Sequence, residues 1–284
     1  MRALTALIFA AVMLTGLLWN FWSFFILFSV IHFGCWVEYQ KLVGQIDKGY
    51  SGITFVHKYG VIIAGWCLMF FFTGSSYQIF NFSLHKIGYW AGLIILFSIP
   101  VLEIIFWRKV NFKYLMISVF GLLYISLSWG LLTNLRSRFD SDFLGDFIGK
   151  MFVMLIVASI WINDTMAYIV GSFIGKTPLT KISPKKTWEG TVGGIILSIL
   201  VVGIFGFFIN ADKDWQSILQ LMAIAGVASV SGTFGDLLES KLKRMADVKD
   251  SGHIMPGHGG FLDRFDSLLV ATPFVWLCII LFMN

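Results

Sequence analysis

The residue types that could do chemistry gather in two clusters in the second half of the chain. The larger cluster spans residues 231–266 and mixes carboxylates with Lys and Arg between two apolar stretches. Proteins use such mixtures to hold a hard cation together with phosphate groups. Its candidate catalytic residues are Asp236, Asp263, Asp266, Lys243, Arg244, Lys249, Asp250, His258 and Arg264.

Spacing within the larger cluster favours a shared site. Asp236 and Glu239 are three positions apart, and so are Asp263 and Asp266, so each pair would share one face of a helix. If a membrane helix begins near Asp266, these carboxylates can converge at the membrane surface. The alternative is that neighbouring charges merely pair with one another.

His258 stands between two glycines in the larger cluster. An imidazole there could act as a general base, a phosphate donor or a metal ligand. It could equally be a loop histidine with one structural hydrogen bond, and both interpretations stay open.

The smaller cluster joins Asp164, inside an apolar stretch, to residues 183–190. A carboxylate at the centre of a membrane helix costs about 2.5–3.5 kcal/mol, so such a residue is functional by default or paired with a cation. Thr187 is expected to cap a helix that opens at Trp188, and a helix N-terminus beside hydroxyl and ammonium groups favours phosphate binding. The candidate substrate-binding residues are Asp164, Ser183, Lys185, Lys186, Thr187, Glu189, Glu239 and Ser240. The alternative is a basic loop that holds anionic lipid headgroups.

The composition places these clusters in a membrane protein. The chain of 284 residues is 57% hydrophobic and 13% charged, whereas soluble domains are about 45–50% apolar and about 25% charged. We expect an all-α, polytopic bundle of about nine transmembrane helices. The candidate spans are residues 3–19, 21–38, 60–80, 87–107, 114–135, 150–174, 191–209, 217–236 and 267–283. The first two are expected to be two helices joined by a tight turn near Trp19 and Asn20. Both are short, and a re-entrant hairpin is an alternative for them.

The placement of the basic residues predicts the orientation. With the N-terminus in the cytoplasm, most of the 21 Lys and Arg fall in cytoplasmic segments, as the positive-inside rule requires. The net charge of +5 therefore marks a membrane face and indicates no nucleic-acid partner. Residues 1–150 are expected to form N-terminal transmembrane helices without a dense polar cluster. Residues 151–284 are expected to form the catalytic region of the same functional unit.

The larger cluster resembles the signature of the phosphatidate cytidylyltransferases, also called CDP-diacylglycerol synthases. The order and gaps match along the whole stretch, except that Met255 stands where Leu, Ile or Phe is expected before the proline. Residues 164–165 and 183–190 are similar to the upstream motif of that family. The matching residues are Ser240, Leu242, Lys243, Arg244, Lys249, Asp250, Gly252, Pro256, His258, Gly259, Gly260, Phe261, Asp263, Arg264, Phe265 and Asp266.

The resemblance implies an enzyme of phospholipid biosynthesis in a bacterial inner membrane, with its active site facing the cytoplasm. It would transfer CMP from CTP to phosphatidic acid, giving CDP-diacylglycerol and pyrophosphate. It implies Mg²⁺ as cofactor, with Asp236 and Asp263 as metal ligands, and leaves open a second cation and a homodimer.

Two other functions remain as alternatives. A CTP-dependent lipid-alcohol kinase, of the dolichol or phytol kinase type, would share the nucleotide but transfer the γ-phosphate. A transporter would need a polar path across the spans, whereas here only Asp164 is expected to lie deep. The sequence contains no P-loop, nucleophile elbow, H-E-x-x-H motif or dinucleotide glycine fingerprint.

Overall fold

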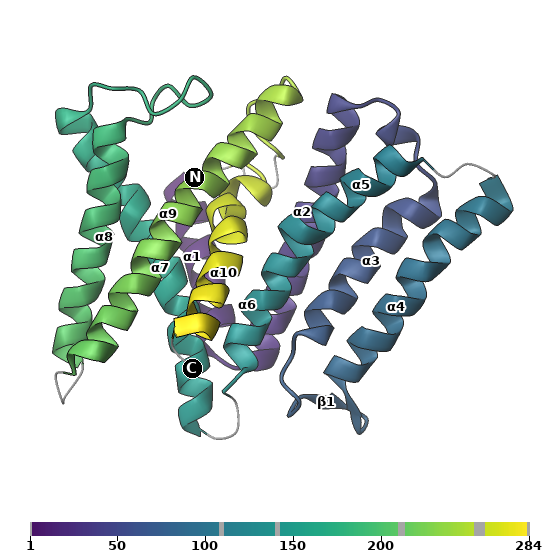
Figure 1. Ribbon diagram of the computed structural model, residues 1–284, viewed down its shortest axis with the longest axis horizontal. Coiled ribbons are helices and arrows are strands. Elements are labelled where there is room, and N and C mark those ends of the chain that lie inside the picture. Colours follow the sequence, from purple (N-terminus) through teal and green to yellow (C-terminus); the bar gives the residue numbers. More distant parts are fainter. Residues whose placement is uncertain (1, 108–110, 140–142, 210–213, 253–258, 283–284) are drawn as a thin grey trace. The chain divides into compact units, whose positions relative to one another are not determined.

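The computed structural model describes residues 2–107, 111–139, 143–209, 214–252 and 259–282, and these are almost entirely helical (Figure 1). The chain forms two compact units. The first unit contains residues 1–150 and 245–264, and the second contains residues 151–244 and 265–284. Residues 245–264, which we call the signature segment, thus belong to the first unit although they lie near the end of the sequence.

The first unit is a group of helices with short connections. Its helices are α1 (Arg2–Leu18), α2 (Phe21–Ile46), α3 (Phe55–Phe71), α4 (Leu84–Leu102), α5 (Phe112–Gly121) and α6 (Leu127–Ser137). A 3₁₀ turn (Tyr50–Gly52) precedes α3, and π-helical turns follow α4 (Glu103–Trp107) and α5 (Leu122–Ser126). Helices α3 and α4 are joined through a hairpin of β1 (Gln78–Ile79) and β2 (Phe82–Ser83), which pairs Gln78 with Ser83 and Ile79 with Phe82 (Figure 1).

The break between α1 and α2 is made by a capping box at Asn20. The Asn20 side chain accepts a hydrogen bond from the Ser23 amide at 2.9 Å, and the Ser23 hydroxyl accepts one from the Asn20 amide at 3.1 Å. The expected turn near Trp19 and Asn20 is confirmed. Behind it, α2 buries large aromatic side chains such as Phe28 and Trp36, and the Trp36 indole donates to Ser126 Oγ at 2.8 Å.

The second unit is built from four long helices. They are α7 (Phe143–Ile174), whose first residues belong to the first unit, α8 (Trp188–Ile209), α9 (Trp215–Met245) and α10 (Leu262–Phe282). Polar contacts tie α7 to its neighbours. Ser198 Oγ of α8 donates to the Ser159 carbonyl at 3.0 Å, and Asn163 Nδ2 lies 3.4 Å from Thr233 Oγ1 of α9.

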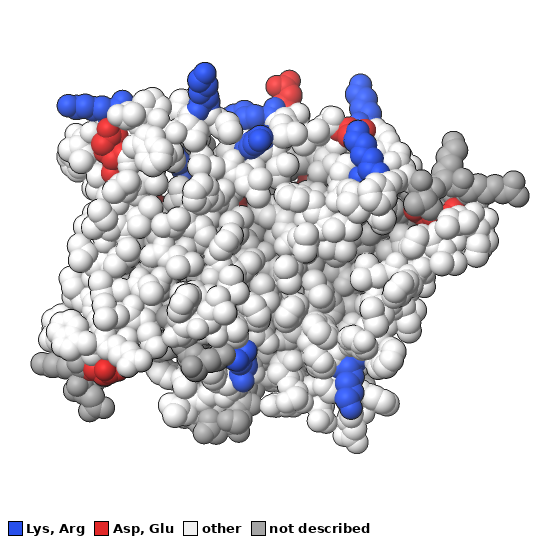
Figure 2. Space-filling model, viewed as in Figure 1, with Lys and Arg blue, Asp and Glu red and all other residues white. Residues whose placement is uncertain are grey.

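The protein is an integral membrane protein. Among the described residues, seven helices are long and apolar enough to cross a membrane, and residues 9–18 and 55–71 form shorter apolar helices. Each of the nine expected spans corresponds to a helix or to a run of helical turns. Several bounds differ. Helix α2 continues to Ile46, α9 continues to Met245 and α7 begins at Phe143, whereas the span expected over residues 60–80 runs past the end of α3 at Phe71 and into β1. On the face drawn in Figure 2, most exposed charged side chains lie near the ends of the helices, and uncharged residues cover the surface between them.

Candidate active site

Helix α9 continues to Met245, beyond the expected end of its span, and therefore carries several residues of the larger cluster. Asp236, Ser240 and Lys243 recur at positions i, i+4 and i+7 of this helix and therefore share one face. Ser240 Oγ donates to Asp236 Oδ1 at 3.2 Å, which orients the carboxylate. The helix expected to carry Asp236 and Glu239 thus continues through Ser240 and Lys243.

Lys186 forms an ion pair with Asp236, and each side chain is a little under one-third exposed. The segment between α7 and α8 positions this lysine. The Leu179 amide donates to the Lys186 carbonyl at 2.7 Å, and the Trp188 amide donates to the Thr177 carbonyl at 2.9 Å. The two sides of the segment therefore run antiparallel and present Lys186 toward α9.

The start of α8 is capped as the sequence predicts. Thr187 Oγ1 accepts a hydrogen bond from the Gly190 amide at 3.2 Å. Glu189 accepts from the amides of Lys176 and Thr177, each at 3.2 Å, so its carboxylate holds the backbone of the connecting segment. Of the other upstream candidates, Lys185 is exposed and Ser183 is half-buried.

Two further carboxylates surround the ion pair. Asp164 of α7 interacts electrostatically with Lys186 and Asp236, and Asp266 of α10 interacts with Asp236, Lys243 and Asp164. We call Asp164, Lys186, Asp236 and Asp266 the polar cluster. It brings together one residue from each of three helices and one from a connecting segment, all within the second unit.

A glycine lets α9 and α10 approach closely beside the polar cluster. A Cβ atom on Gly235 would lie 2.4 Å from the Asp266 carbonyl oxygen and 3.0 Å from Ser267 Cα. Only glycine fits this contact without displacing backbone. Gly235, the residue before Asp236, therefore determines how close Asp236 lies to α10.

Glu239 lies three positions after Asp236 on α9. Its side chain is fully buried, and it pairs with Lys243 at 2.5 Å, one turn along the helix. The pair keeps the Glu239 charge compensated inside the protein. Arg244, also expected at the site, is exposed near the end of α9.

Asp263 lies in the first turn of α10 and belongs to the first unit. Its Oδ2 atom accepts hydrogen bonds from the Ser251 amide at 2.9 Å and from the Gly260 amide at 2.7 Å, and the Ser251 hydroxyl lies 2.9 Å from it. Asp263 and Asp236 belong to different units, so their convergence on one cation stays a prediction. Arg264 is exposed, and His258 lies outside the described residues.

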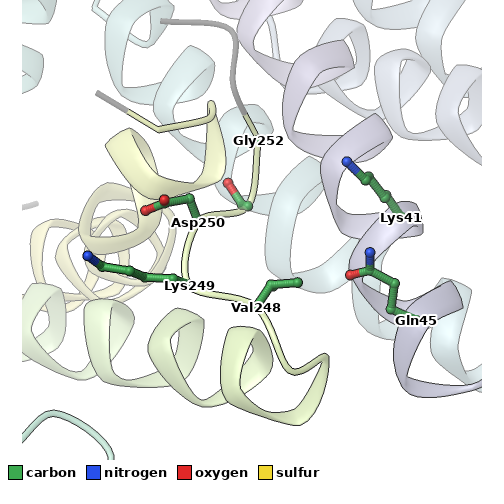
Figure 3. A pocket seen from close by; sticks show the side chains of 7 residues that line it. Lys41, Gln45, Val248, Lys249, Asp250 and Gly252 are labelled. Carbon is green, nitrogen blue, oxygen red and sulfur yellow. The ribbon is translucent and has the colours of Figure 1, made fainter. Parts of the chain in front are cut away.

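Lys249 and Asp250 lie beside a cavity of about 320 Å³ in the first unit, lined by Lys41, Gln45 and residues 248–252 (Figure 3). The side chains of Lys41 and Gln45 reach from α2 toward the signature segment, whereas those of Lys249 and Asp250 point away from α2 (Figure 3). The N-terminal helices thus contribute polar groups next to the signature residues.

A second cavity, of about 770 Å³, lies in the second unit and is mainly apolar. Side chains of α9 and α10, including Val230, Phe234 and Phe274, line it, and Ile182 borders it from the connecting segment. Lys241 is the charged side chain of its lining. A cavity with this lining suits a hydrocarbon chain with a polar end.

The donor chemistry of the polar cluster fits Mg²⁺, which prefers carboxylate oxygen ligands and retains several waters. Asp236 already binds a cation, the ammonium of Lys186. Within the part of the chain that the structure describes, no three His, Cys, Asp or Glu side chains lie close enough to enclose a metal ion by themselves. The residues of the polar cluster therefore fit a metal ion that is held by one or two carboxylates and by phosphate oxygens of the substrate.

Glu38 is a site neighbour that the sequence analysis missed. It lies in α2, in the half of the chain expected to lack a polar cluster, and it contacts the signature segment through Ser251 and residues 261–262. The signal that could have found it is the one that singled out Asp164, an acidic residue within an apolar span.

Comparisons with known proteins agree with these features. A model of the cytidylyltransferase family matches residues 1–282. The chain is 44% identical over 138 residues to the phosphatidate cytidylyltransferase of Bacillus subtilis, which covers 48% of this chain and 50% of that protein. It is 42% identical over 136 residues to the protein of the same name from Synechocystis, covering 48% of this chain and 45% of that protein. The match thus spans about half the length of these curated relatives.

Proposed function

Because the chain belongs to the cytidylyltransferase family, we propose that it is a phosphatidate cytidylyltransferase, which transfers CMP from CTP to phosphatidic acid. The observation that carries the proposal is the polar cluster of Asp164, Lys186, Asp236 and Asp266 in helices that are otherwise apolar. Carboxylates beside an ammonium group match a polyphosphate bound with a cation. The names of the relatives support the choice of CTP and phosphatidate.

The reaction is a substitution at the α-phosphorus of CTP. An oxygen of the phosphatidate monoester forms the new P–O bond, and the bond to the bridging oxygen of the β-phosphate breaks. CDP-diacylglycerol and pyrophosphate are the products. The attacking phosphate is already anionic, so no strong general base is needed, and positioning and charge neutralisation supply the catalysis.

The residues of the chain would neutralise and orient these phosphates. Lys186 and Lys243 lie beside the carboxylates of the polar cluster, where they would bind phosphate oxygens of CTP. Asp236 and Asp266 would hold Mg²⁺ in the second unit, and Asp263 is the candidate ligand from the first unit. When bound, the metal would withdraw charge from the leaving pyrophosphate. Lys186 would then exchange its bond to Asp236 for a phosphate oxygen.

The mainly apolar cavity of the second unit would receive an acyl chain of phosphatidate. Its walls are apolar side chains of α9 and α10, and Lys241 could meet the lipid phosphate at its polar end. Phe234, Leu237 and Leu238 of this cavity alternate along α9 with Asp236 and Ser240. The hydrocarbon chain would thus stay in an apolar environment while the headgroup meets a water-soluble nucleotide.

We propose that the active site faces the cytoplasm from a bacterial inner membrane, because most Lys and Arg fall in the segments that are cytoplasmic when the N-terminus is in the cytoplasm. Single cysteines introduced at Lys185 and Lys249 would be labelled by an impermeant maleimide only from the cytoplasmic side. Labelling of both from outside intact cells would overturn this orientation.

The decisive experiment incubates the purified protein with phosphatidate, Mg²⁺ and CTP labelled in its α-phosphate, and then separates the lipids. The proposal predicts a labelled CDP-lipid and one pyrophosphate for each lipid formed, with CTP far more effective than ATP. Labelled CDP with an unlabelled phospholipid would instead indicate a lipid-alcohol kinase. Flux of a solute through vesicles without nucleotide turnover would indicate a transporter.

A further inference from the structure

Glu38 is a buried carboxylate to which the proposed reaction assigns no role. Its side chain lies in α2 and is 4% exposed. It accepts hydrogen bonds from Ser251 Oγ at 2.7 Å and from the amides of Phe261 and Leu262, each at 2.9 Å. All of these partners belong to the first unit. A buried carboxylate is tolerated only when its oxygens receive such donors, so this contact is a defined binding arrangement and not an incidental one.

The donors of Glu38 lie on both sides of residues 253–258. Ser251 precedes that stretch, and residues 261–262 follow it at the start of α10. The amide of Leu262 is one of the four at a helix start that lack a partner within the helix. Glu38 therefore caps α10 from another helix, and the same carboxylate also binds Ser251.

Ser251 connects Glu38 to Asp263. Its hydroxyl lies 2.7 Å from Glu38 Oε2 and 2.9 Å from Asp263 Oδ2, and its amide also donates to Asp263. A hydroxyl has one proton, so Ser251 Oγ donates to one of the two carboxylates at a time. The orientation of Asp263 is thus tied to Glu38 through one shared group.

Two glycines of the signature segment make room for the same carboxylate. A Cβ on Gly252 would lie 2.2 Å from Glu38 Oε1, and a Cβ on Gly260 would lie 2.3 Å from both carboxylate oxygens. Gly259 has a φ of +79°, which only glycine adopts readily, and its Cβ would lie 2.6 Å from Asp263 Oδ2. The backbone of the segment is therefore fitted around the two carboxylates.

From these contacts we propose that Glu38 is a positioning residue of the active site, which fixes Ser251 and the start of α10 so that Asp263 is held in one orientation for the cation and phosphates. The inference rests on the proposed function for its catalytic meaning. Glu38 itself touches no reacting atom in this account, and it acts through Ser251 and the start of α10.

The test compares Glu38→Gln with Glu103→Gln. Glu103 is an equally buried acid of the first unit, 5% exposed, and its Oε1 atom binds Thr54 and His57. Among the described residues of the signature segment, none forms a hydrogen bond with it. Each substitution replaces a carboxylate by an amide of nearly the same shape and removes one negative charge. A general effect of removing a buried charge should therefore appear in both variants.

For Glu38→Gln we expect kcat to fall at least tenfold and the Mg²⁺ concentration for half-maximal rate to rise at least fivefold, while KM for phosphatidate changes less than twofold. Glu38→Asp should recover part of the rate, because it keeps the charge. Ser251→Ala should resemble Glu38→Gln, and the double variant should be no worse than either, since the two residues act as one unit. Glu103→Gln should leave the Mg²⁺ dependence unchanged.

A second measurement does not depend on turnover. Amide hydrogen exchange of Ser251, Phe261 and Leu262 should accelerate at least tenfold in Glu38→Gln and stay unchanged in Glu103→Gln. Absence of CDP-lipid from the wild-type protein would refute the proposed function but leave this exchange result as the test of the contact. Unchanged exchange, or an unchanged Mg²⁺ dependence in an active Glu38→Gln protein, would overturn the role of Glu38.

Discussion

The contact at Gly235 offers a sharp test of the polar cluster, because a single methyl group would move it. In Gly235→Ala the new Cβ would sit 2.4 Å from the Asp266 carbonyl oxygen, where ordinary contact needs about 3.4 Å. Helix α9 must therefore retreat from α10 by about 1 Å. Since Asp236 follows directly in the chain, its carboxylate would shift by a similar amount relative to Asp266.

The expected cost follows from that displacement. Misplacement of catalytic groups by about 1 Å can lower a rate about a hundredfold, and overpacking of this kind destabilises a protein by about 1–3 kcal/mol. Gly235→Ala should therefore insert and purify but form CDP-lipid about a hundredfold more slowly. The assay is initial-rate lipid formation from labelled CTP, with the melting temperature measured on the same sample.

Gly232→Ala is the matched control. It lies one turn earlier in α9, and its added Cβ would meet Ile160 and Ser267 side-chain atoms at 3.4 and 3.5 Å, which is ordinary contact. This variant should keep nearly full activity. The dependence of the rate on the contact between α9 and α10 is refuted if folded Gly235→Ala retains more than about a third of the wild-type rate. It is also refuted if Gly232→Ala loses as much activity as Gly235→Ala.

The remaining predictions concern the metal ligands and the lipid. Asp236→Asn and Asp263→Asn should each lower turnover at least a hundredfold, because the amide lacks the charge that a hard cation needs. The double variant should be little worse than either single variant. The control Asp47→Asn, outside the motifs, should stay near wild type. More than about a tenth of the activity in either single variant at saturating Mg²⁺ would exclude that residue as a ligand, since less than about 1.4 kcal/mol would have been lost. Val230→Trp, which fills the apolar cavity, should raise KM for long-chain phosphatidate several-fold and leave KM for CTP unchanged; equal KM values for the lipid would show that the acyl chain lies elsewhere.

The sequence predicted the membrane helices well where hydropathy is the dominant signal. It placed the end of α9 too early, because hydropathy stops at the first charges whereas the helix does not. Glu239 and Lys243 pair one turn apart and are compatible with continued helix, so α9 runs on to Met245. The same holds for the end of α2 at Ile46.

The site residues were recognisable by type, but their partners were not. Lys186 and Asp236 are 50 positions apart, and their pairing depends on how the segment before α8 folds back toward α9. Glu38 escaped notice for a related reason. One acid at the end of an apolar span looks like an interfacial residue until its donors, more than 200 positions away, are known. Spacing reveals neighbours within one helix, whereas neighbours from different helices require the fold.

The contact between Glu38 and the start of α10 has a consequence for biogenesis. Glu38 is synthesised 213 to 224 positions before its donors. At about 5–20 residues per second, the ribosome needs roughly 10–40 s to deliver them. During that interval α2 enters the bilayer with an acidic side chain that has none of its final partners, and burying a carboxylate without such donors is unfavourable. The first helices to be inserted are therefore completed by the last, and a chain whose synthesis stops before α10 presents an uncompensated charge that membrane quality control can recognise.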